Sequence, residues 1–333
     1  MAESAAIFGE NEPERSGVTE SFNMASESLQ ATASPAHRAI PRVSVGMPAF
    51  NAERFIAAAI ESVLAQTHTD LELIVSDNAS TDRTVAICER YVAADPRVRL
   101  LRCDVNRGAH PNYRKVAVAA RGHYFKWAAA NDLIAPDFLA GCVAVLDSQP
   151  DAVLAFGRTL LFEDDPLQGT PYEDRMDICD DDPLQRFRRC VEGLRLNNVL
   201  NGVLRRHDLL NTSLMPDYMN ADVLVLAELS LAGKFVEVPS TRFYRRMSQE
   251  SATRLQSKEA VRKHHYPPGA SRGLFQAWRL ELGYLRAVMR APLALDKRLA
   301  ALSYVARQSY WRAGDLAADF RDAARRWRPR NPR

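Results

Sequence analysis

The chain has 333 residues, of which 47% are hydrophobic and 26% are charged, and its formal net charge is +3. These values are typical of a globular protein with one large or two smaller domains, and they exclude collagen-like, coiled-coil and wholly disordered chains. The near-neutral total also argues against a strongly basic nucleic-acid-binding protein, so we expect no nucleic-acid partner. The charge is unevenly spread, however, because Arg262–Arg333 contains 16 Lys+Arg and 5 Asp+Glu.

The N-terminal segment differs from the rest of the chain. Residues 1–41 are rich in Ala, Ser and Glu without sustained periodicity, which predicts a disordered tail. They lack the pattern of a signal peptide, and the chain has no apolar run of 18 residues that would predict a transmembrane helix. Five cysteines without C-x-x-C spacing predict free thiols. We therefore expect a cytoplasmic protein, with peripheral association at the inner face of a membrane as an alternative.

Strand and helix patterns alternate from residue 42 onward. The expected strands are 42–48, 71–75, 98–101, 124–128 and 153–161. The expected helices follow Asn51, a plausible N-terminal cap, and Thr81, and then cover 112–120 and 137–146. This alternation predicts an α/β fold, with a mostly parallel sheet flanked by helices. Ligands of such sheets bind beyond the carboxyl ends of the strands, which places the candidate loops at 48–51, 76–82 and 129–136.

The second half is less regular. An acidic loop is expected over 163–183, a helix over 222–231 and a strand over 234–238. Two or three amphipathic helices with basic faces are expected over 272–328, interrupted near Pro292. These faces suit docking on an anionic membrane, and the alternative is a helical appendage packed on the preceding domain with a solvated Arg face. RNA binding is disfavoured because the aromatic pattern of known RNA-binding modules is absent.

Acidic side chains follow three of the predicted strands. Asp77 ends the second strand, Asp82 lies five residues further on, and Asn131-Asp132 follows the fourth strand. Carboxylates that meet at strand ends can bind Mg²⁺ or Mn²⁺ together with substrate phosphates. Each residue also has a structural interpretation: Asp82 as a first-turn helix carboxylate, and Asp77 and Asp132 as turn residues.

The order of several motifs resembles family 2 glycosyltransferases. The resemblance covers roughly residues 42–245 and rests on Val43–Asn51, Ser62–Thr67, Glu72–Asp82, Asn106–Gly108, Asn112, Ala120–Tyr124 and Asn131–Pro136. It implies a GT-A fold over 42–250, with a nucleotide-binding half at 42–135, an acceptor half at 136–250 and a basic helical extension at 251–333.

The resemblance also implies an activity. It implies inverting, hexosyl-type transfer from a nucleotide-sugar donor to a hydroxyl of a saccharide or lipid-linked acceptor, in polysaccharide, glycolipid or other glycoconjugate biosynthesis. A divalent metal, Mn²⁺ or Mg²⁺, would assist the transfer by neutralising the diphosphate.

By position, the resemblance assigns roles on the donor side. The base pocket would be lined by Pro48, Ala49, Phe50 and Asn51. Asp77 would accept a hydrogen bond from the base, and Arg107 and Asn112 sit where the donor loop lies. Asp132 occupies the last acidic position of the metal-binding motif, and Asn131 the neighbouring ribose- or metal-contacting position.

The resemblance places the general base at the head of a helix in the second half. Asp222, which precedes Leu224, Leu226 and Leu229, is the matching residue, and its structural alternative is a helix N-cap. Glu228 is the second choice, because it lies on a similar face nearly two turns further along.

Two departures from the family pattern bear on activity. Only one carboxylate stands in Ala129–Asp132, and no His follows Tyr244-Arg245-Arg246. The two arginines could neutralise phosphate, or they could lie at a solvated strand edge. These departures leave a non-catalytic, nucleotide-sugar-binding relative as the alternative function. A dinucleotide-dependent enzyme is disfavoured, since no G-x-G-x-x-G follows the first strand.

Overall fold

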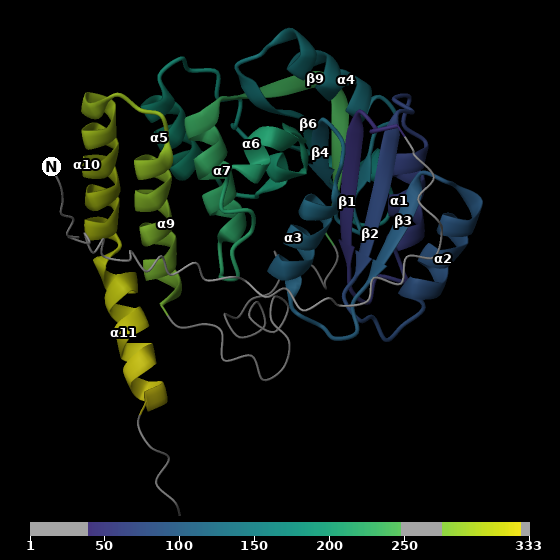
Figure 1. The fold of residues 1–333 in the computed structure, drawn as a ribbon, viewed down its shortest axis with the longest axis horizontal. Coiled ribbons are helices and arrows are strands. Elements are labelled where there is room, and N and C mark those ends of the chain that lie inside the picture. Colours follow the sequence, from purple (N-terminus) through teal and green to yellow (C-terminus); the bar gives the residue numbers. More distant parts are fainter. Residues whose placement is uncertain (1–38, 248–274, 328–333) are drawn as a thin grey trace, which may run out of the picture. The chain divides into compact units, whose positions relative to one another are not determined.

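The computed structural model describes residues 39–247 and 275–327, so residues 1–38 of the predicted tail lie outside the described residues. In these ranges nine strands form one sheet in the order β3-β2-β1-β4-β8-β6-β9-β5, with β7 paired to β6 (Figure 1). The strands are β1 Val43–Ala49, β2 Leu71–Asp77, β3 Val98–Arg102, β4 Tyr124–Trp127, β5 Leu133–Ile134, β6 Ala152–Phe162, β7 Thr170–Tyr172, β8 Val203–Arg205 and β9 Lys234–Arg246.

Helices connect these strands and follow the last of them. The α-helices are α1 Ile56–Leu64, α2 Thr84–Ala94, α3 Ala109–Ala119, α4 Phe138–Ser148, α5 Pro183–Gly193, α6 Arg206–Leu210, α7 Ala221–Ala232, α9 Gln276–Arg290, α10 Leu295–Trp311 and α11 Ala313–Trp327. Two 3₁₀ turns, η1 Pro166–Gln168 and η2 Asn198–Asn201, lie in the second half. Within the described part of the chain, every helix is too short or too polar to cross a bilayer.

The fold class is confirmed, and the elements predicted up to residue 162 occur in the predicted order. β3, β2, β1 and β4 are parallel neighbours, whereas β8 pairs antiparallel with both β4 and β6. The short strands β5, β7 and β8 and the helices α5 and α6 were not predicted, because they are brief or lack a clear period. The predicted boundaries at residues 41, 135 and 250 stay predictions.

One predicted helix cap is wrong. α1 begins at Ile56 after Phe55, whereas Asn51 lies in the loop before it with a positive φ of 48°. The Asn51 side chain instead accepts a hydrogen bond from the Thr81 amide, at 2.8 Å. Asn51 therefore joins the loop after β1 to the loop after β2 and caps no helix.

Alternating side chains of the parallel strands face two apolar layers. Val45 and Met47 of β1 pack in the layer that contains α1 and α4, while Phe125 of β4 packs with α3 and α7. Gly46 faces α3, and a Cβ on it would lie 2.8 Å from Val116 of that helix. Glycine at this position thus permits the close approach of α3 to the sheet.

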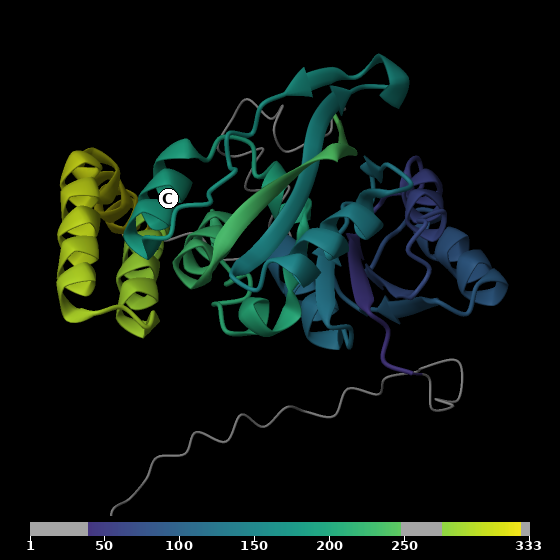
Figure 2. The ribbon, with the colours of Figure 1, turned by 90° about the horizontal axis from the view of Figure 1, so that it is seen from above.

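The C-terminal helices pack on α5 and α7 through an apolar cluster of their own. Phe187 of α5 meets Tyr284 of α9 and Tyr304 of α10 edge-on, at centroid distances of 5.8 and 6.0 Å. Leu224 of α7 belongs to the same cluster, and Lys297 of α10 pairs with Asp182 at 2.9 Å. In Figures 1 and 2, α9 and α10 accordingly lie beyond α5 and α7, on the side away from β3.

A buried carboxylate joins strands at the amino end of the parallel sheet, opposite the candidate site. Glu72 accepts hydrogen bonds from Ser44 at 2.7 Å and from the Arg121 amide at 3.0 Å, and it forms ion pairs with Arg99 and Arg121. Burial alone would raise the Glu72 pKa, but the hydrogen bonds from Ser44 and Arg121 outweigh it and lower the pKa below its ordinary value.

We expect Glu72→Gln to reduce the free energy of unfolding at pH 7 by about 1.5–3 kcal/mol, because it removes charged hydrogen-bond acceptors from a buried site. The lowered pKa means that ionised Glu72 stabilises the fold above its unfolded pKa, and that this stabilisation is lost as the pH falls through the folded pKa. Urea unfolding at pH 7 and pH 3 should therefore show a smaller difference between wild type and variant at the lower pH.

Glu89→Gln is the matched control for this measurement. Glu89 pairs with Arg102 at 3.0 Å on the surface, and such pairs contribute about 0–1 kcal/mol. Equal losses in the two variants, or a Glu72→Gln loss that does not change with pH, would contradict the assigned role.

Candidate active site

The carboxyl ends of β1 and β2 bring the first two candidate loops together. Ala49 and Asp77 are partners in the parallel register, and the Asn78 amide donates to the Ala49 carbonyl at 2.9 Å. The Asn51 amide donates to Ser80 at 2.9 Å, which adds a second link between the loops. Residues 49–51 and 77–80 thus form one surface at the end of the sheet.

Asp77 presents an unused acceptor at this surface. Its side chain is 2% exposed, and Oδ2 accepts from the Ser80 amide at 3.1 Å. Oδ1 is buried and meets no donor among the described residues. Ser76 Oγ and Asn112 Oδ1 are likewise buried without a hydrogen-bond partner there. Buried polar atoms are nearly always paired in native proteins, so these three atoms point to a polar ligand or to water.

The four predicted base-pocket residues fall into two groups. Pro48 and Ala49 belong to β1 and are buried, while Phe50 is 46% exposed and Asn51 is exposed. The Phe50 ring is exposed at the strand end where Asp77 Oδ1 is buried without a donor among the described residues, and these two groups suit a planar, hydrogen-bonding ligand such as a nucleobase.

The third predicted element of the donor side is the loop before α3. Asn78 accepts from the Arg107 amide at 3.0 Å and donates to the Gly108 carbonyl at 3.1 Å. Asn112 of α3 donates to the Ser76 carbonyl at 2.9 Å, beside Asp77. The structure therefore brings Arg107 and Asn112 to the same strand end as Asp77. The role of Asn78 in holding the loop could not be read from its position in the sequence.

Asp82 has a structural role, but it is not the first-turn helix carboxylate of its alternative interpretation, because α2 begins at Thr84 and its first turn contains no acidic residue. Its two oxygens accept from the Thr84 amide at 2.9 Å, at the start of α2, and from the Glu53 amide at 3.0 Å. Burial opposes ionisation, but the hydrogen bonds from Thr84 and Glu53 together outweigh it and lower the Asp82 pKa. Asp82 stabilises the loop and the first turn of α2.

Asp132 lies between the loop after β4 and the end of β9. Its Oδ1 accepts from the Arg246 amide at 2.8 Å, and Arg246 Nε donates to the Asn131 carbonyl at 3.1 Å. The Arg246 guanidinium lies over the rings of Phe55 and Phe162, at 4.5 and 4.4 Å. Burial raises the Asp132 pKa to about 6, against the opposing effect of the Arg246 amide and of Arg245, Lys126 and Arg246.

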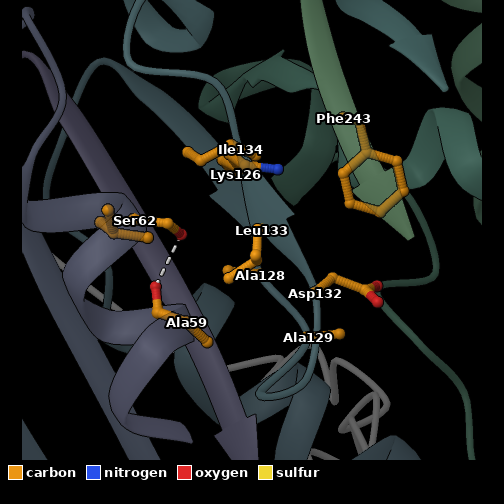
Figure 3. A pocket seen from close by; sticks show the side chains of 10 residues that line it. Ala59, Ser62, Lys126, Ala128, Ala129, Asp132, Leu133, Ile134 and Phe243 are labelled. Atoms are coloured by element: carbon orange, nitrogen blue, oxygen red, sulfur yellow. Dashed lines mark hydrogen bonds between the residues drawn. The ribbon is translucent and has the colours of Figure 1, made fainter. Parts of the chain in front are cut away.

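A buried lysine lies behind Asp132. Lys126 of β4 is 1% exposed, and its ammonium donates to the Trp127 carbonyl and to the Asn201 carbonyl and lies 4.7 Å from the Phe138 ring centre. Burial lowers its pKa to about 7. Figure 3 shows Lys126 and Asp132 at a small cavity, with both polar groups turned toward the side where Phe243 lies. The one sequence signal for Lys126 is a lysine inside an otherwise apolar strand.

The residues around Asp132 limit how a divalent metal could bind. In residues 39–247 and 275–327 no group of three or more His, Cys, Asp or Glu side chains is placed to hold a metal ion. Ala129 and Ala130 offer no side-chain ligand, and Asp132 is already surrounded by three cationic side chains. The site fits a cation that takes one carboxylate from the protein and its other ligands from phosphate and water, as Mg²⁺ commonly does.

Asp222 comes from the other half of the fold. It is the second residue of α7, whose N-cap is Asn220, so the N-cap interpretation of Asp222 is wrong. Its Oδ2 accepts a hydrogen bond from the Asn197 amide group. Burial raises the pKa of Tyr113 to about 12, and the carboxylates of Asp132 and Asp222 both contribute to this shift.

Glu228, the second choice for the base, is engaged elsewhere. Its carboxylate accepts from the Ser213 amide at 2.7 Å and from the Ser213 hydroxyl at 2.6 Å. Burial raises the Glu228 pKa, while these hydrogen bonds partly offset that effect. The contacts hold the loop before α7 to that helix.

The comparisons with known proteins agree with this geometry. Residues 44–194 match the family model described as glycosyl transferase family 2. Two curated relatives are chondroitin synthase of Escherichia coli, 35% identical over 31% of this chain, and the succinoglycan biosynthesis protein ExoO of Rhizobium meliloti, 36% identical over 41% of this chain. The matched segments span 15% and 41% of those two proteins.

The fold also resembles solved structures. The Staphylococcus aureus TarS 1–349 structure in complex with UDP-GlcNAc aligns with a TM-score of 0.59 and 16% sequence identity, covering 81% of this chain and 72% of that one. At this identity the likeness concerns the fold, and it extends past the segment that the family model matches.

Proposed function

Because residues 44–194 belong to glycosyl transferase family 2, we propose that this chain transfers a sugar from a nucleotide-diphosphate donor to an acceptor hydroxyl with inversion. The observation that carries the proposal is the buried Asp77 Oδ1, which meets no donor within residues 39–247 and 275–327, at the strand end where the Phe50 ring is exposed. A base edge with an N–H group would satisfy this oxygen, and the ring would cover one face of the base.

Two carboxylates would have separate roles in the reaction, one in accepting a proton and one in binding a metal. Asp222 would accept the proton of the acceptor hydroxyl, whose oxygen forms the new bond to the anomeric carbon as the bond to the diphosphate breaks on the opposite side. Hydrogen bonding from Asn197 orients the Asp222 carboxylate for this role. When bound through Asp132, Mn²⁺ or Mg²⁺ would supply Lewis-acid stabilisation of the diphosphate leaving group. Asn131 would contact the ribose beside it.

The acceptor class is inferred from the relatives and from the C-terminal helices. The two curated relatives are named for chondroitin and succinoglycan synthesis, which supports a saccharide or lipid-linked acceptor in polysaccharide or glycoconjugate biosynthesis. The exposed side of α9 carries Arg279, Arg286 and Arg290 together with Leu282 and Met289. Such a face suits the headgroup region of an anionic membrane, and peripheral contact there stays a prediction.

A non-catalytic donor-binding protein is the second candidate. It is favoured by the single carboxylate in the metal-binding motif, Asp132, and by the cations that already surround it. Such a protein would bind a nucleotide sugar through Asp77 and transfer nothing.

One experiment separates these candidates. The purified full chain is incubated with a panel of nucleotide sugars, with and without Mn²⁺, and both donor binding and nucleoside diphosphate release are measured. The proposed transferase should bind one donor class and release its nucleoside diphosphate faster when an acceptor is added. Donor binding without release would support the non-catalytic candidate, and absence of binding to every donor would reject both.

A further inference from the structure

Arg245 and Arg246 at the end of β9 have different surroundings. Neighbouring residues of a strand point to opposite faces, and the Arg246 side chain is 7% exposed, lying over two aromatic rings with its NH1 2.5 Å from the Glu163 carbonyl. Arg245 is half-buried, and its NH1 donates to Asn198 Oδ1 at 2.5 Å. Arg246 therefore serves the fold, whereas Arg245 is directed toward the η2 turn.

A chain of hydrogen bonds fixes the orientation of Arg245. Asn198 Nδ2 donates to Asp174 Oδ1 at 2.8 Å, and the Thr159 hydroxyl donates to Asp174 Oδ2 at 2.5 Å. Since an ionised carboxylate accepts and does not donate, Asp174 determines which end of the Asn198 amide faces it. The Asn198 oxygen must then face Arg245. Thr159, Asp174 and Asn198 are all nearly fully buried, so this arrangement is rigid.

Arg245 also lies close to the candidate reaction centre. Leu133 pairs with Tyr244 in the antiparallel register of β5 and β9, so Arg245 follows Tyr244 at the position next to Asp132, and the next amide of β9, that of Arg246, donates to Asp132 Oδ1 at 2.8 Å. Arg245 therefore lies at the end of β9 that also holds Asp132, with its side chain bonded to the η2 turn. The same turn holds Asp222 through Asn197, which precedes Asn198.

We propose that Arg245, positioned by Asn198 and Asp174, binds the diphosphate group of the donor and of the released nucleoside diphosphate. The inference rests on the proposed function, because it assigns a phosphate ligand to the same site. A guanidinium fork can donate two parallel hydrogen bonds to phosphate oxygens. The Arg245 guanidinium would place positive charge beside the diphosphate. A metal-binding motif with a single carboxylate does not by itself retain a divalent cation there.

The adjacent asparagines give this assignment a geometric consequence. Asn197 orients the carboxylate that takes the acceptor proton, and Asn198 orients the cation that receives the leaving group. In an inverting displacement the attacking and leaving oxygens lie on opposite sides of the anomeric carbon, so the groups that contact them need fixed positions relative to each other. Asn197 and Asn198 are consecutive residues, and they fix Asp222 and Arg245 in this way.

The test compares ligands that differ only in phosphate. Calorimetry measures the affinities for the nucleoside diphosphate of the donor identified by the screen and for the corresponding nucleoside, with EDTA present. In Arg245→Gln the preference for the diphosphate should fall by about tenfold to a hundredfold, because a charged hydrogen bond is lost, while nucleoside affinity stays unchanged. Arg245→Lys should retain part of the preference, and Asp174→Asn should lower it without changing nucleoside affinity.

Arg242→Gln is the matched control, because Arg242 is on the same strand and donates to the Pro239 and Thr241 carbonyls away from Asp132. Thermal unfolding of each variant identifies loss of fold. An unchanged ratio of diphosphate to nucleoside affinity in folded Arg245→Gln would overturn the inference, as would an equal loss for both ligands. If the wild type binds neither ligand, the proposed function itself fails.

Discussion

Asp222→Asn is expected to lower the rate of sugar transfer by about 10²–10⁴-fold, the range that a positioned general base contributes. The substitution keeps the shape of the side chain and removes its ability to accept a proton from the acceptor. Donor affinity should not change, because Asp222 lies on α7 and the base-binding atoms lie at the ends of β1 and β2. The measurement is steady-state transfer together with calorimetric donor binding.

Glu228→Gln is the control for this experiment. Glu228 is held by Ser213, so its variant should lose stability and retain turnover close to that of the wild type. Asn197→Ala should give an intermediate loss of rate with no loss of donor affinity, because it leaves Asp222 present but unsupported. A folded Asp222→Asn protein with wild-type turnover would exclude Asp222 as the base.

Asp132→Asn is expected to reduce turnover by about 10²–10³-fold, as does removal of other electrostatic groups at a reaction centre. The amide oxygen of asparagine can still accept from the Arg246 amide, so the loop after β4 should keep its position. What is lost is the one carboxylate available to a divalent cation. Stimulation by Mn²⁺ should therefore disappear together with most of the rate.

The comparison for this variant is Asp82→Asn, which removes a carboxylate from a neighbouring loop. Asp82 supports the first turn of α2, so its loss should cost about 1 kcal/mol in the free energy of unfolding and leave stimulation by Mn²⁺ intact. Undiminished stimulation by Mn²⁺ in Asp132→Asn would remove Asp132 from the metal site.

The sequence was sufficient for the parallel half of the fold. β1, β2, β3 and β4 are short, apolar-rich runs separated by helical periodicity, and both signals are local. Because parallel strands end at one edge, the sequence also predicted that Asp77 and Asp132 would lie at that edge. The similarity of residues 44–194 to glycosyl transferase family 2 was likewise predicted from the order of the motifs.

The rest depended on contacts between distant residues. Asp82 and Asp77 look alike in the sequence, yet Asp82 accepts from the Thr84 and Glu53 amides while Asp77 keeps a buried oxygen that meets no donor in the described part of the chain. Arg245 and Arg246 are neighbours of the same type, and only the packing of Phe55 and Phe162 distinguishes them.

The sequence by itself thus determined the strands and helices of the parallel half and the order of the polar residues along the chain, because backbone preference and side-chain periodicity act over a few residues. Only the tertiary structure decided which polar groups are already paired. Asp222 meets Asn197 across 25 positions, and Arg246 meets Asp132 across 114. Such partners are brought together by the packing of whole elements, and burial then sets the cost of leaving each group unpaired.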